Sequence, residues 1–167
     1  NKPLDDLNDL VWFMILGTVI GARLGHCLFY NPDFYLSNPL EILKVWRGGL
    51  ASHGAAIGIL TTIYFYSKKK KNQSFLWVMD RVVITVALAA FFIRMGNLFN
   101  SEIVGYPTDL AWGFIFTSID NIPRHPAQLY ESIFYLLTFL ILIYMFWKTR
   151  AKYKTGMLFG VFKNSVI

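Results

Sequence analysis

Residues 94–105 combine side chains that can bind a phosphate with a position at the end of a long apolar run. The segment reads RMGNLFNSEIVG, so a fixed cation is followed by amide and carboxyl groups. A charged side chain near the middle of a bilayer costs roughly 2.5–3.5 kcal/mol on insertion scales, and such groups usually face a bundle interior or a wet cavity. A guanidinium can hold a phosphate through two parallel hydrogen bonds and stays protonated. We therefore expect Arg94 to bind a phospholipid headgroup; the alternatives are that it reaches the outer interface or pairs with Glu102.

His53 and residues 124–131 add further polar groups at the ends of apolar runs. Histidine exchanges protons near neutral pH, so His53 is a candidate general base, or else a structural histidine with satisfied hydrogen bonds. Residues 124–131 read RHPAQLYE, in which Tyr130 and Glu131 either join the same site or anchor a helix at the interface. The three histidines lack the spacing of a ligand pair and no HExxH motif occurs, which argues against a metal site.

The composition is that of an integral membrane protein. Of the 167 residues, 55% are hydrophobic and 17% are aromatic, and the mean hydropathy is clearly positive. The formal net charge of +6 comes from short basic clusters beside the apolar runs, a pattern typical of cytoplasmic loops and not of a nucleic-acid-binding surface. The single cysteine, Cys27, excludes a disulfide framework and a cysteine-based metal site, and we interpret it as a small buried residue.

Four apolar runs have about the 20 residues that a membrane-spanning helix needs. They cover residues 10–30, 50–67, 76–99 and 127–147, and a fifth run from Gly156 is too short. The sequence thus predicts an all-α fold: a polytopic transmembrane helix bundle of four full spanning helices plus a truncated fifth, in a single membrane-embedded domain over residues 1–167.

The basic residues predict the orientation of these helices, because cytoplasmic loops are enriched in Lys and Arg. One side holds eight of them: Lys68, Lys69, Lys70, Lys71, Lys148, Arg150, Lys152 and Lys154. The other side, residues 31–49 and 100–126, holds three: Lys44, Arg47 and Arg124. The second side is therefore expected outside, and every polar cluster except Asp80 and Arg81 falls in the outer half, where one outward-facing cavity could collect them.

Glycines recur every four residues on the first two predicted helices. Gly17, Gly21 and Gly25 lie on the first, and Gly54 and Gly58 on the second. Small residues at this spacing allow helix backbones to approach closely in a membrane. We interpret these glycines as a helix-packing surface.

Four segments occur in the order and at the spacing of one known family. They are residues 21–30 (GARLGHCLFY), 46–58 (WRGGLASHGAAIG), 94–105 and 124–131. On these motifs the chain resembles prolipoprotein diacylglyceryl transferase, a bacterial membrane enzyme of lipoprotein maturation. Two departures stand out: Ala55 occupies a position that is usually glycine, and the family's later arginine-rich motif has no counterpart here.

The resemblance implies transfer of the diacylglyceryl group of phosphatidylglycerol to the thiol of the lipobox cysteine of a preprolipoprotein, with release of glycerol phosphate. It implies that His53 and Arg94 are the catalytic residues and that the enzyme needs no bound cofactor. It also implies that the nucleophile belongs to the substrate, so Cys27 is not the nucleophile. The implied location is the bacterial cytoplasmic (inner) membrane, multi-pass, with the active site toward the outer face. The expected substrate-binding residues are Arg94, Asn97, Asn100, Glu102, Gly105, Tyr30, Arg23, Arg124, His125, Gln128, Tyr130 and Glu131.

Two further expectations accompany this interpretation. Members of the family usually carry one more helix before this region and more after it, so we expect the chain to be a fragment lacking an N-terminal helix and the C-terminal helices. The alternative function is a small membrane transporter or channel whose Arg23 and Arg94 bind an anion in transit. Transport predicts polar residues through the full thickness of the bundle, whereas the inner half holds few apart from Asp80 and Arg81, which favours the enzyme.

Overall fold

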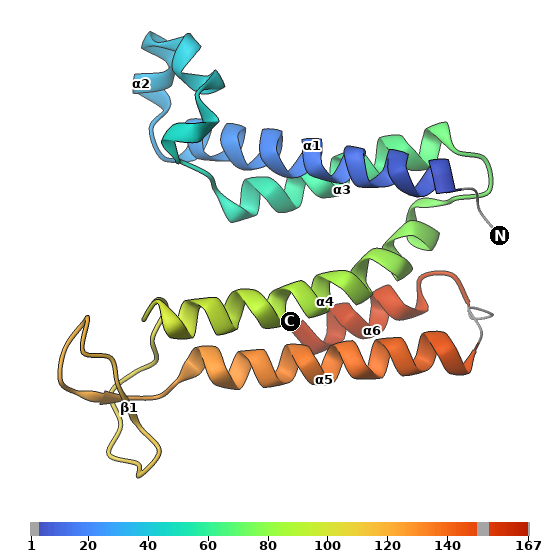
Figure 1. Cartoon of the computed structure of the whole chain (residues 1–167). Helices are drawn as coiled ribbons and strands as arrows, with labels where there is room; N and C mark the ends of the chain where they lie inside the picture. Colours follow the sequence, from blue (N-terminus) through green and yellow to red (C-terminus); the bar gives the residue numbers. More distant parts are fainter. Residues whose placement is uncertain (1–3, 150–153, 167) are drawn as a thin grey trace. The chain divides into compact units, whose positions relative to one another are not determined.

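The computed structural model describes residues 4–149 and 154–166, and it is mostly helical, as predicted (Figure 1). The chain forms two compact units, Asn1–Val78 and Met79–Ile167, which we describe separately. Arg150 and Lys152, used above to predict the orientation, lie outside the described residues. In chain order the elements are α1 (Leu4–Phe29), α2 (Pro32–Ser37), the 3-10 turns η1 (Pro39–Leu43) and η2 (Val45–Arg47), α3 (Ser52–Lys69), α4 (Phe75–Phe99), β1 (Phe114–Ile115), β2 (Pro123–Arg124), α5 (Ala127–Lys148) and α6 (Met157–Val166).

Three helices of the described residues are long and apolar enough to cross a membrane. They are α1, α4 and α5, with 26, 25 and 22 residues. Helix α3 has 18 residues but falls short in hydropathy, because it begins with Ser52 and His53 and ends with Lys68 and Lys69. Helix α6 has 10 residues, about half of a span. The helical membrane class is therefore supported, whereas the count of four full spans and a truncated fifth stays a prediction.

The first unit is held together by the predicted glycine contacts between α1 and α3, which run side by side in opposite directions (Figure 1). A Cβ atom added to Gly25 would lie 2.7 Å from the Cα of Gly54, and one added to Gly21 would lie 2.8 Å from the Cα of Gly58. Only glycine allows backbones this close. The prediction of a helix-packing surface is confirmed.

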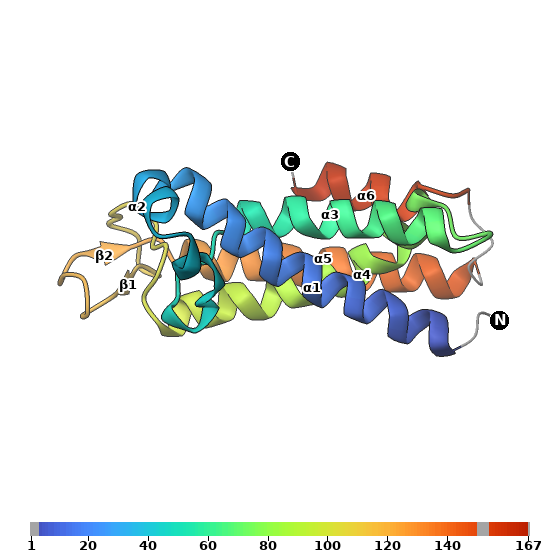
Figure 2. The same ribbon diagram turned by 90° about the horizontal axis from the view of Figure 1, so that it is seen from above.

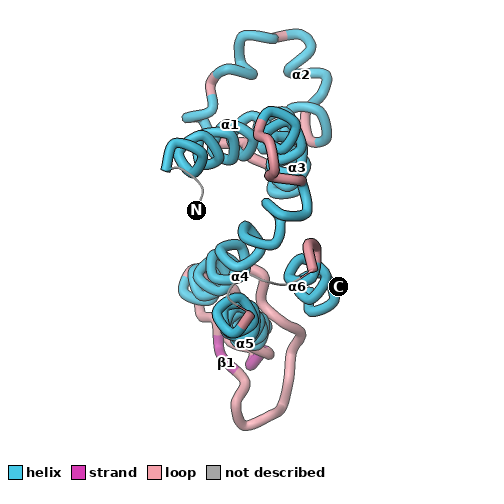
Figure 3. Tube along the Cα trace, turned by 90° about the vertical axis from the view of Figure 1, so that its right-hand side faces the viewer, coloured by secondary structure: helices cyan, strands magenta, loops and turns pink. Residues whose placement is uncertain are grey.

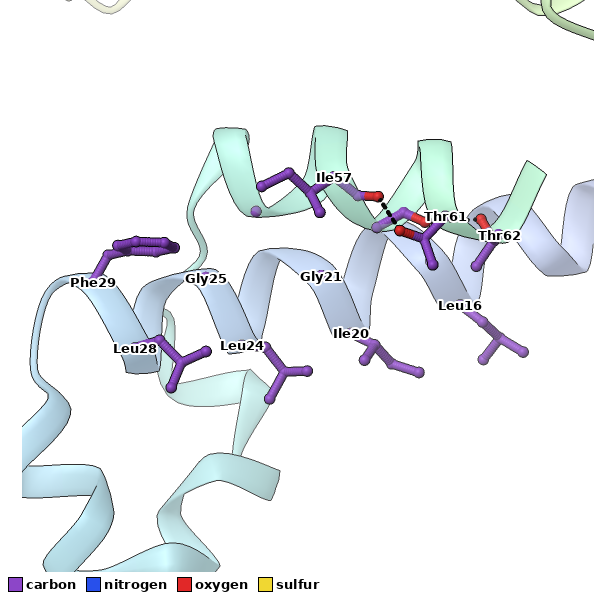
Figure 4. Close-up of a pocket in the computed structure, with 13 residues that line it drawn as sticks. Leu16, Ile20, Gly21, Leu24, Gly25, Leu28, Phe29, Ile57, Thr61 and Thr62 are labelled. Atoms are coloured by element: carbon purple, nitrogen blue, oxygen red, sulfur yellow. Dashed lines mark hydrogen bonds between the residues drawn. The ribbon is translucent and has the colours of Figure 1, made fainter. Parts of the chain in front are cut away.

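This close approach leaves an apolar groove along α1 and α3 (Figure 4). The groove encloses about 340 Å³. Glycine backbone forms its floor, Leu16, Ile20, Leu24 and Leu28 line it from α1, and Phe29 lies at one end. Such a surface suits hydrocarbon, because it offers almost no polar group.

A polar cluster fastens the other end of this unit. The Nζ of Lys70 lies 2.6 Å from a carboxylate oxygen of Asp6 and 2.7 Å from one of Asp9. Gln73 donates to Asp6, and the buried hydroxyl of Tyr66 lies 2.9 Å from the Asp6 carbonyl oxygen. Hydrogen bonds to the two carboxylates raise the pKa of Lys70 above its ordinary value. The start of α1 is thereby tied to the end of α3.

In the second unit, a buried carboxylate of α4 holds the start of α6. Asp80 of α4 is fully buried and accepts hydrogen bonds from the backbone N–H groups of Gly156 (2.6 Å) and Phe159 (2.9 Å). These groups lie at the start of α6, where a helix has no internal acceptors for its N–H donors. Asp80 thus caps α6 from another helix, which accounts for one of the two charged residues that the sequence placed in the inner half.

Residues 100–126 connect α4 to α5 and include a small antiparallel pairing of β1 with β2, located beyond the ends of the two helices (Figure 2). Viewed along the helix axes, α5 lies directly beside α4 (Figure 3). The predicted polar residues of this unit therefore gather at one end of a helix pair.

Candidate phosphate-binding site

Arg94 of α4 is held by Glu131 of α5. The Nε of Arg94 lies 2.5 Å from Oε2 of Glu131, and its two terminal nitrogens have no partner among the described residues. The side chain is 26% exposed. It lines a cavity of about 370 Å³ together with Glu131, Phe134, Tyr135, Thr138 and Ser165. The free edge of the guanidinium is the one that can bind a phosphate through two hydrogen bonds.

The partner of Arg94 differs from the one considered from the sequence, since Glu102 is engaged elsewhere. Asn97 Nδ2 donates to Glu102 Oε2 at 2.7 Å, and Gln128 Nε2 donates to the Glu102 carbonyl oxygen at 2.5 Å. The backbone of this turn is unusual, because Ser101 and Ile103 have φ angles of 56° and 54°. A β-branched residue rarely adopts such a conformation. The turn presents Glu102 to both helices at once, and the exposed Asn100 precedes it.

Gly105 and His125 pair where the chain leaves this turn and returns to α5. Gly105 N donates to the His125 carbonyl oxygen at 3.1 Å, and His125 N donates to the Tyr106 carbonyl oxygen at 3.0 Å. A Cβ atom at Gly105 would lie 2.5 Å from the His125 carbonyl oxygen, so the position requires glycine. Beside them, Arg124 lies 2.5 Å from Asp120 and holds the pKa of that carboxyl below its usual value.

Tyr130 connects the loop to the start of α5. Its hydroxyl accepts a hydrogen bond from Trp112 Nε1 at 3.0 Å and lies 3.3 Å from His125 Nδ1. Trp112 was not among the residues predicted for the site. The indole N–H is a donor that needs an acceptor, and this requirement was the signal that could have linked it to a polar cluster.

In the first unit, His53 lies among aromatic rings at the start of α3. Its ring centroid is 5.9 Å from that of Tyr30 and 5.5 Å from that of Phe29, and the His26 ring stacks on Tyr30 at a centroid distance of 5.4 Å. His53 is exposed, and its ring nitrogens have no hydrogen-bond partner within the described residues. Both ring nitrogens are therefore accessible to a ligand.

Arg23, which was expected to bind substrate, is committed to the loop that follows α1. It is only 4% exposed, and its guanidinium carbon lies 5.1 Å from the centre of the Tyr35 ring. It donates hydrogen bonds of 2.6 to 3.2 Å to the carbonyl oxygens of Glu41, Ile42, Gly48 and Gly49. These contacts give Arg23 a structural role, holding residues 41–49 against α1, and leave substrate binding by Arg23 a prediction.

Residues 1–166 match the sequence model of prolipoprotein diacylglyceryl transferase. The chain belongs to this family. Curated relatives named phosphatidylglycerol–prolipoprotein diacylglyceryl transferase include that of Chloroherpeton thalassium, 57% identical over 99% of this chain and 62% of the relative, and that of Tolumonas auensis, 48% identical over 99% and 64%. A third, from Porphyromonas gingivalis, is 42% identical over 94% of this chain and 59% of the relative. The chain spans about three fifths of the length of these relatives, and the resemblance inferred from the four motifs is confirmed.

The diacylglyceryl transferase motifs therefore fall into two sets in the structure. The second unit brings together most of the expected binding residues at the α4 and α5 ends: Arg94, Asn97, Glu102, Gly105, Arg124, His125, Gln128, Tyr130 and Glu131. The first unit places Tyr30 beside His53. Membership in this family does not favour the transporter alternative.

Proposed function

We propose that this chain acts in the transfer of the diacylglyceryl group of phosphatidylglycerol to the thiol of a preprolipoprotein lipobox cysteine. The observation that carries the proposal is Arg94, held by Glu131 through one nitrogen while two others are available at a cavity. The names of the relatives, phosphatidylglycerol–prolipoprotein diacylglyceryl transferase, support the same substrates.

The reaction is a substitution at carbon. The thiolate sulfur forms a bond to the CH₂ carbon of the diacylglyceryl group as the bond from that carbon to the phosphate oxygen breaks. The electron pair leaves with the oxygen, so the products are a thioether and glycerol phosphate, and the thiol proton passes to a base. No electrons are gained or lost overall, which agrees with the prediction that the reaction needs no cofactor.

Arg94 fits the requirement of this reaction for a cation at the leaving group. The phosphate gains negative charge as the carbon–oxygen bond breaks, so a fixed guanidinium stabilises the transition state more than the bound substrate. Glu131 fixes the plane of the guanidinium before the lipid arrives. Asn97, Glu102 and Gln128 join the two helices that carry this pair.

We assign the general base to His53. Only the thiolate attacks well, and an accessible imidazole can remove the thiol proton near neutral pH. The contacts with Tyr30 and Phe29 restrict the ring without occupying its nitrogens.

We propose further that α1, α3, α4 and α5 all span the bacterial inner membrane and that the Arg94 and His53 ends face outward. Helix α3 packs through its glycines along α1, a candidate span, so the bilayer around α1 also surrounds α3. Its 18 residues extend about 27 Å at 1.5 Å per residue, close to the hydrocarbon thickness.

The experiment is to incubate the purified chain with phosphatidylglycerol and a lipobox peptide and to analyse the peptide by mass spectrometry. We expect a mass increase of one diacylglyceryl group. A matched peptide with serine in place of cysteine should stay unmodified, because an alcohol is a far weaker nucleophile than a thiolate. An unmodified cysteine peptide would contradict the proposal for this chain.

A further inference from the structure

Two buried amide oxygens beside the Arg94 pair lack any hydrogen-bond partner within the described residues. They are Oδ1 of Asn97 and Oε1 of Gln128, and Gln128 as a whole is only 1% exposed. Buried polar atoms in folded proteins are nearly always paired, and an acceptor left without a donor is costly. Two such acceptors on neighbouring helices therefore indicate a ligand that brings hydrogen-bond donors.

The orientation of both amides follows from their common partner. Asn97 and Gln128 each point an NH₂ group at an oxygen of Glu102, one at the carboxylate and one at the backbone carbonyl. An ionised carboxylate and a carbonyl can only accept, so neither amide can be turned over without losing its bond. The atoms without a hydrogen-bond partner are therefore the two amide oxygens and not the NH₂ groups.

These oxygens lie one helical turn from the proposed phosphate position. Asn97 follows Arg94 by three residues on α4, and Gln128 precedes Glu131 by three residues on α5. Side chains three residues apart share one face of a helix. A headgroup whose phosphate contacts Arg94 would therefore extend its outer part toward the two amides.

We propose that Asn97 and Gln128 accept hydrogen bonds from the hydroxyl groups of the headgroup glycerol and thereby select phosphatidylglycerol among phospholipids. The inference rests on the proposed function, since it takes the lipid bound at Arg94 as the substrate. Glycerol is a better match than ethanolamine, because a buried ammonium group needs a carboxylate partner, whereas a hydroxyl is satisfied by a neutral amide oxygen. The nearby carboxylates of Glu102 and Glu131 already have partners.

The test is a binding competition that needs no turnover. Equal amounts of phosphatidylglycerol, phosphatidylpropanol and phosphatidylethanolamine with identical acyl chains are presented to the full chain in one micelle, and the retained lipid is measured by native mass spectrometry. Phosphatidylpropanol keeps the phosphate and its charge but has no headgroup hydroxyl. We expect the wild type to prefer phosphatidylglycerol by roughly ten- to hundredfold, the ratio that corresponds to one or two unpaired buried acceptors.

Side-chain variants then assign the preference. Gln128→Met and Asn97→Leu keep the approximate volume and remove one acceptor each, so each should lower the ratio of phosphatidylglycerol to phosphatidylpropanol by roughly tenfold or less, and the double variant should bring it close to one. The matched control is Gln73→Met, a buried glutamine of the first unit that already has its partners and should leave the ratio unchanged. Each ratio is measured within one sample, so a reduced folded fraction does not alter it.

Equal retention of phosphatidylglycerol and phosphatidylpropanol by the wild type would overturn the inference even if no variant folded. So would a stronger retention of phosphatidylethanolamine, or an unchanged preference in both variants. A different result would contradict the proposed function: the chain would retain phosphatidylglycerol selectively but would not lipidate the peptide.

Discussion

Arg94 pairs with Glu131 on one side of its guanidinium and leaves the other side open to a ligand. This double use explains why the position needs arginine. Glu131 uses Nε, so phosphate binding depends on the two terminal nitrogens. A lysine has the same charge but a single donor group, and it cannot contact carboxylate and phosphate in this planar arrangement. The relevant property is therefore the shape of the guanidinium together with its charge.

We expect Arg94→Lys to fail nearly as badly as Arg94→Ala. Loss of a positioned electrostatic donor typically lowers the rate by roughly 10²–10³-fold, or about 3–4 kcal/mol. The measurement is peptide lipidation at matched expression. Arg47→Lys is the control: Arg47 is an exposed residue of the 3-10 turn η2 and pairs with Glu41, so the activity of this variant should stay within about twofold of wild type. Near-normal turnover by Arg94→Lys would show that only the positive charge at position 94 matters and not the shape of the guanidinium.

His53→Gln should keep lipid binding and lose most of the turnover at neutral pH. Glutamine preserves a hydrogen-bonding group, but it cannot accept the thiol proton, and general bases typically contribute about 10²–10⁴-fold. Raising the pH should restore the variant, because the peptide thiol then ionises without help. Full activity at neutral pH would instead make His53 a structural residue of the cluster with Tyr30.

The α1 and α3 helices depend on the absence of side chains at their crossing. Gly58 meets the carbonyl oxygen of Gly17 and the Cα of Gly21, and an added Cβ would lie 2.9 Å from that Cα. Gly96 of α4 offers a comparison, because a Cβ there would meet nothing within 4 Å. Both glycines are in helices, but Gly58 is tightly packed against another helix, whereas Gly96 has free space around its Cα.

Gly58→Ala should lower the unfolding temperature, and Gly96→Ala should leave it unchanged or raise it. Alanine favours a helix over glycine by about 1 kcal/mol, but overpacking costs typically 1–3 kcal/mol. Thermal unfolding of both variants in the same detergent measures the difference. Equal unfolding temperatures would show that the helices can separate without loss of stability.

Sequence patterns identified these elements because the signals are local. Apolar runs marked α1, α4 and α5, and a four-residue spacing marked the glycines that meet in the structure. The partners of the charged residues were not accessible in this way. Arg94 pairs with Glu131 and not Glu102 because of the register between α4 and α5, and Arg23 reaches carbonyl groups 18 to 26 residues away through the path of a loop. The register between two helices and the path of a loop leave no periodic pattern in the sequence, so neither could be predicted from it.

The orientation of the whole chain in the membrane is a separate prediction. The uneven distribution of basic residues predicts that residues 68–71 face the cytoplasm and that residues 100–126 face outward. After Cys27, which is buried, is replaced by alanine, single cysteines at Ser101 and Lys71 are probed in intact cells with an impermeant thiol reagent. We expect labelling at position 101 only. Labelling at position 71 alone would invert the topology and move the Arg94 end to the cytoplasm.

Headgroup release coupled to thioether formation is the most direct test that this chain is a diacylglyceryl transferase. Phosphatidylglycerol labelled in the headgroup glycerol is mixed with the lipobox peptide and the full chain, and glycerol phosphate and lipidated peptide are quantified in the same sample. Carbon–oxygen cleavage by the thiolate predicts equal amounts of the two products, and both formed roughly 10²–10³-fold more slowly when Arg94 is replaced by alanine. Glycerol phosphate released without lipidated peptide, or equal yields from wild type and Arg94→Ala, would contradict the assignment.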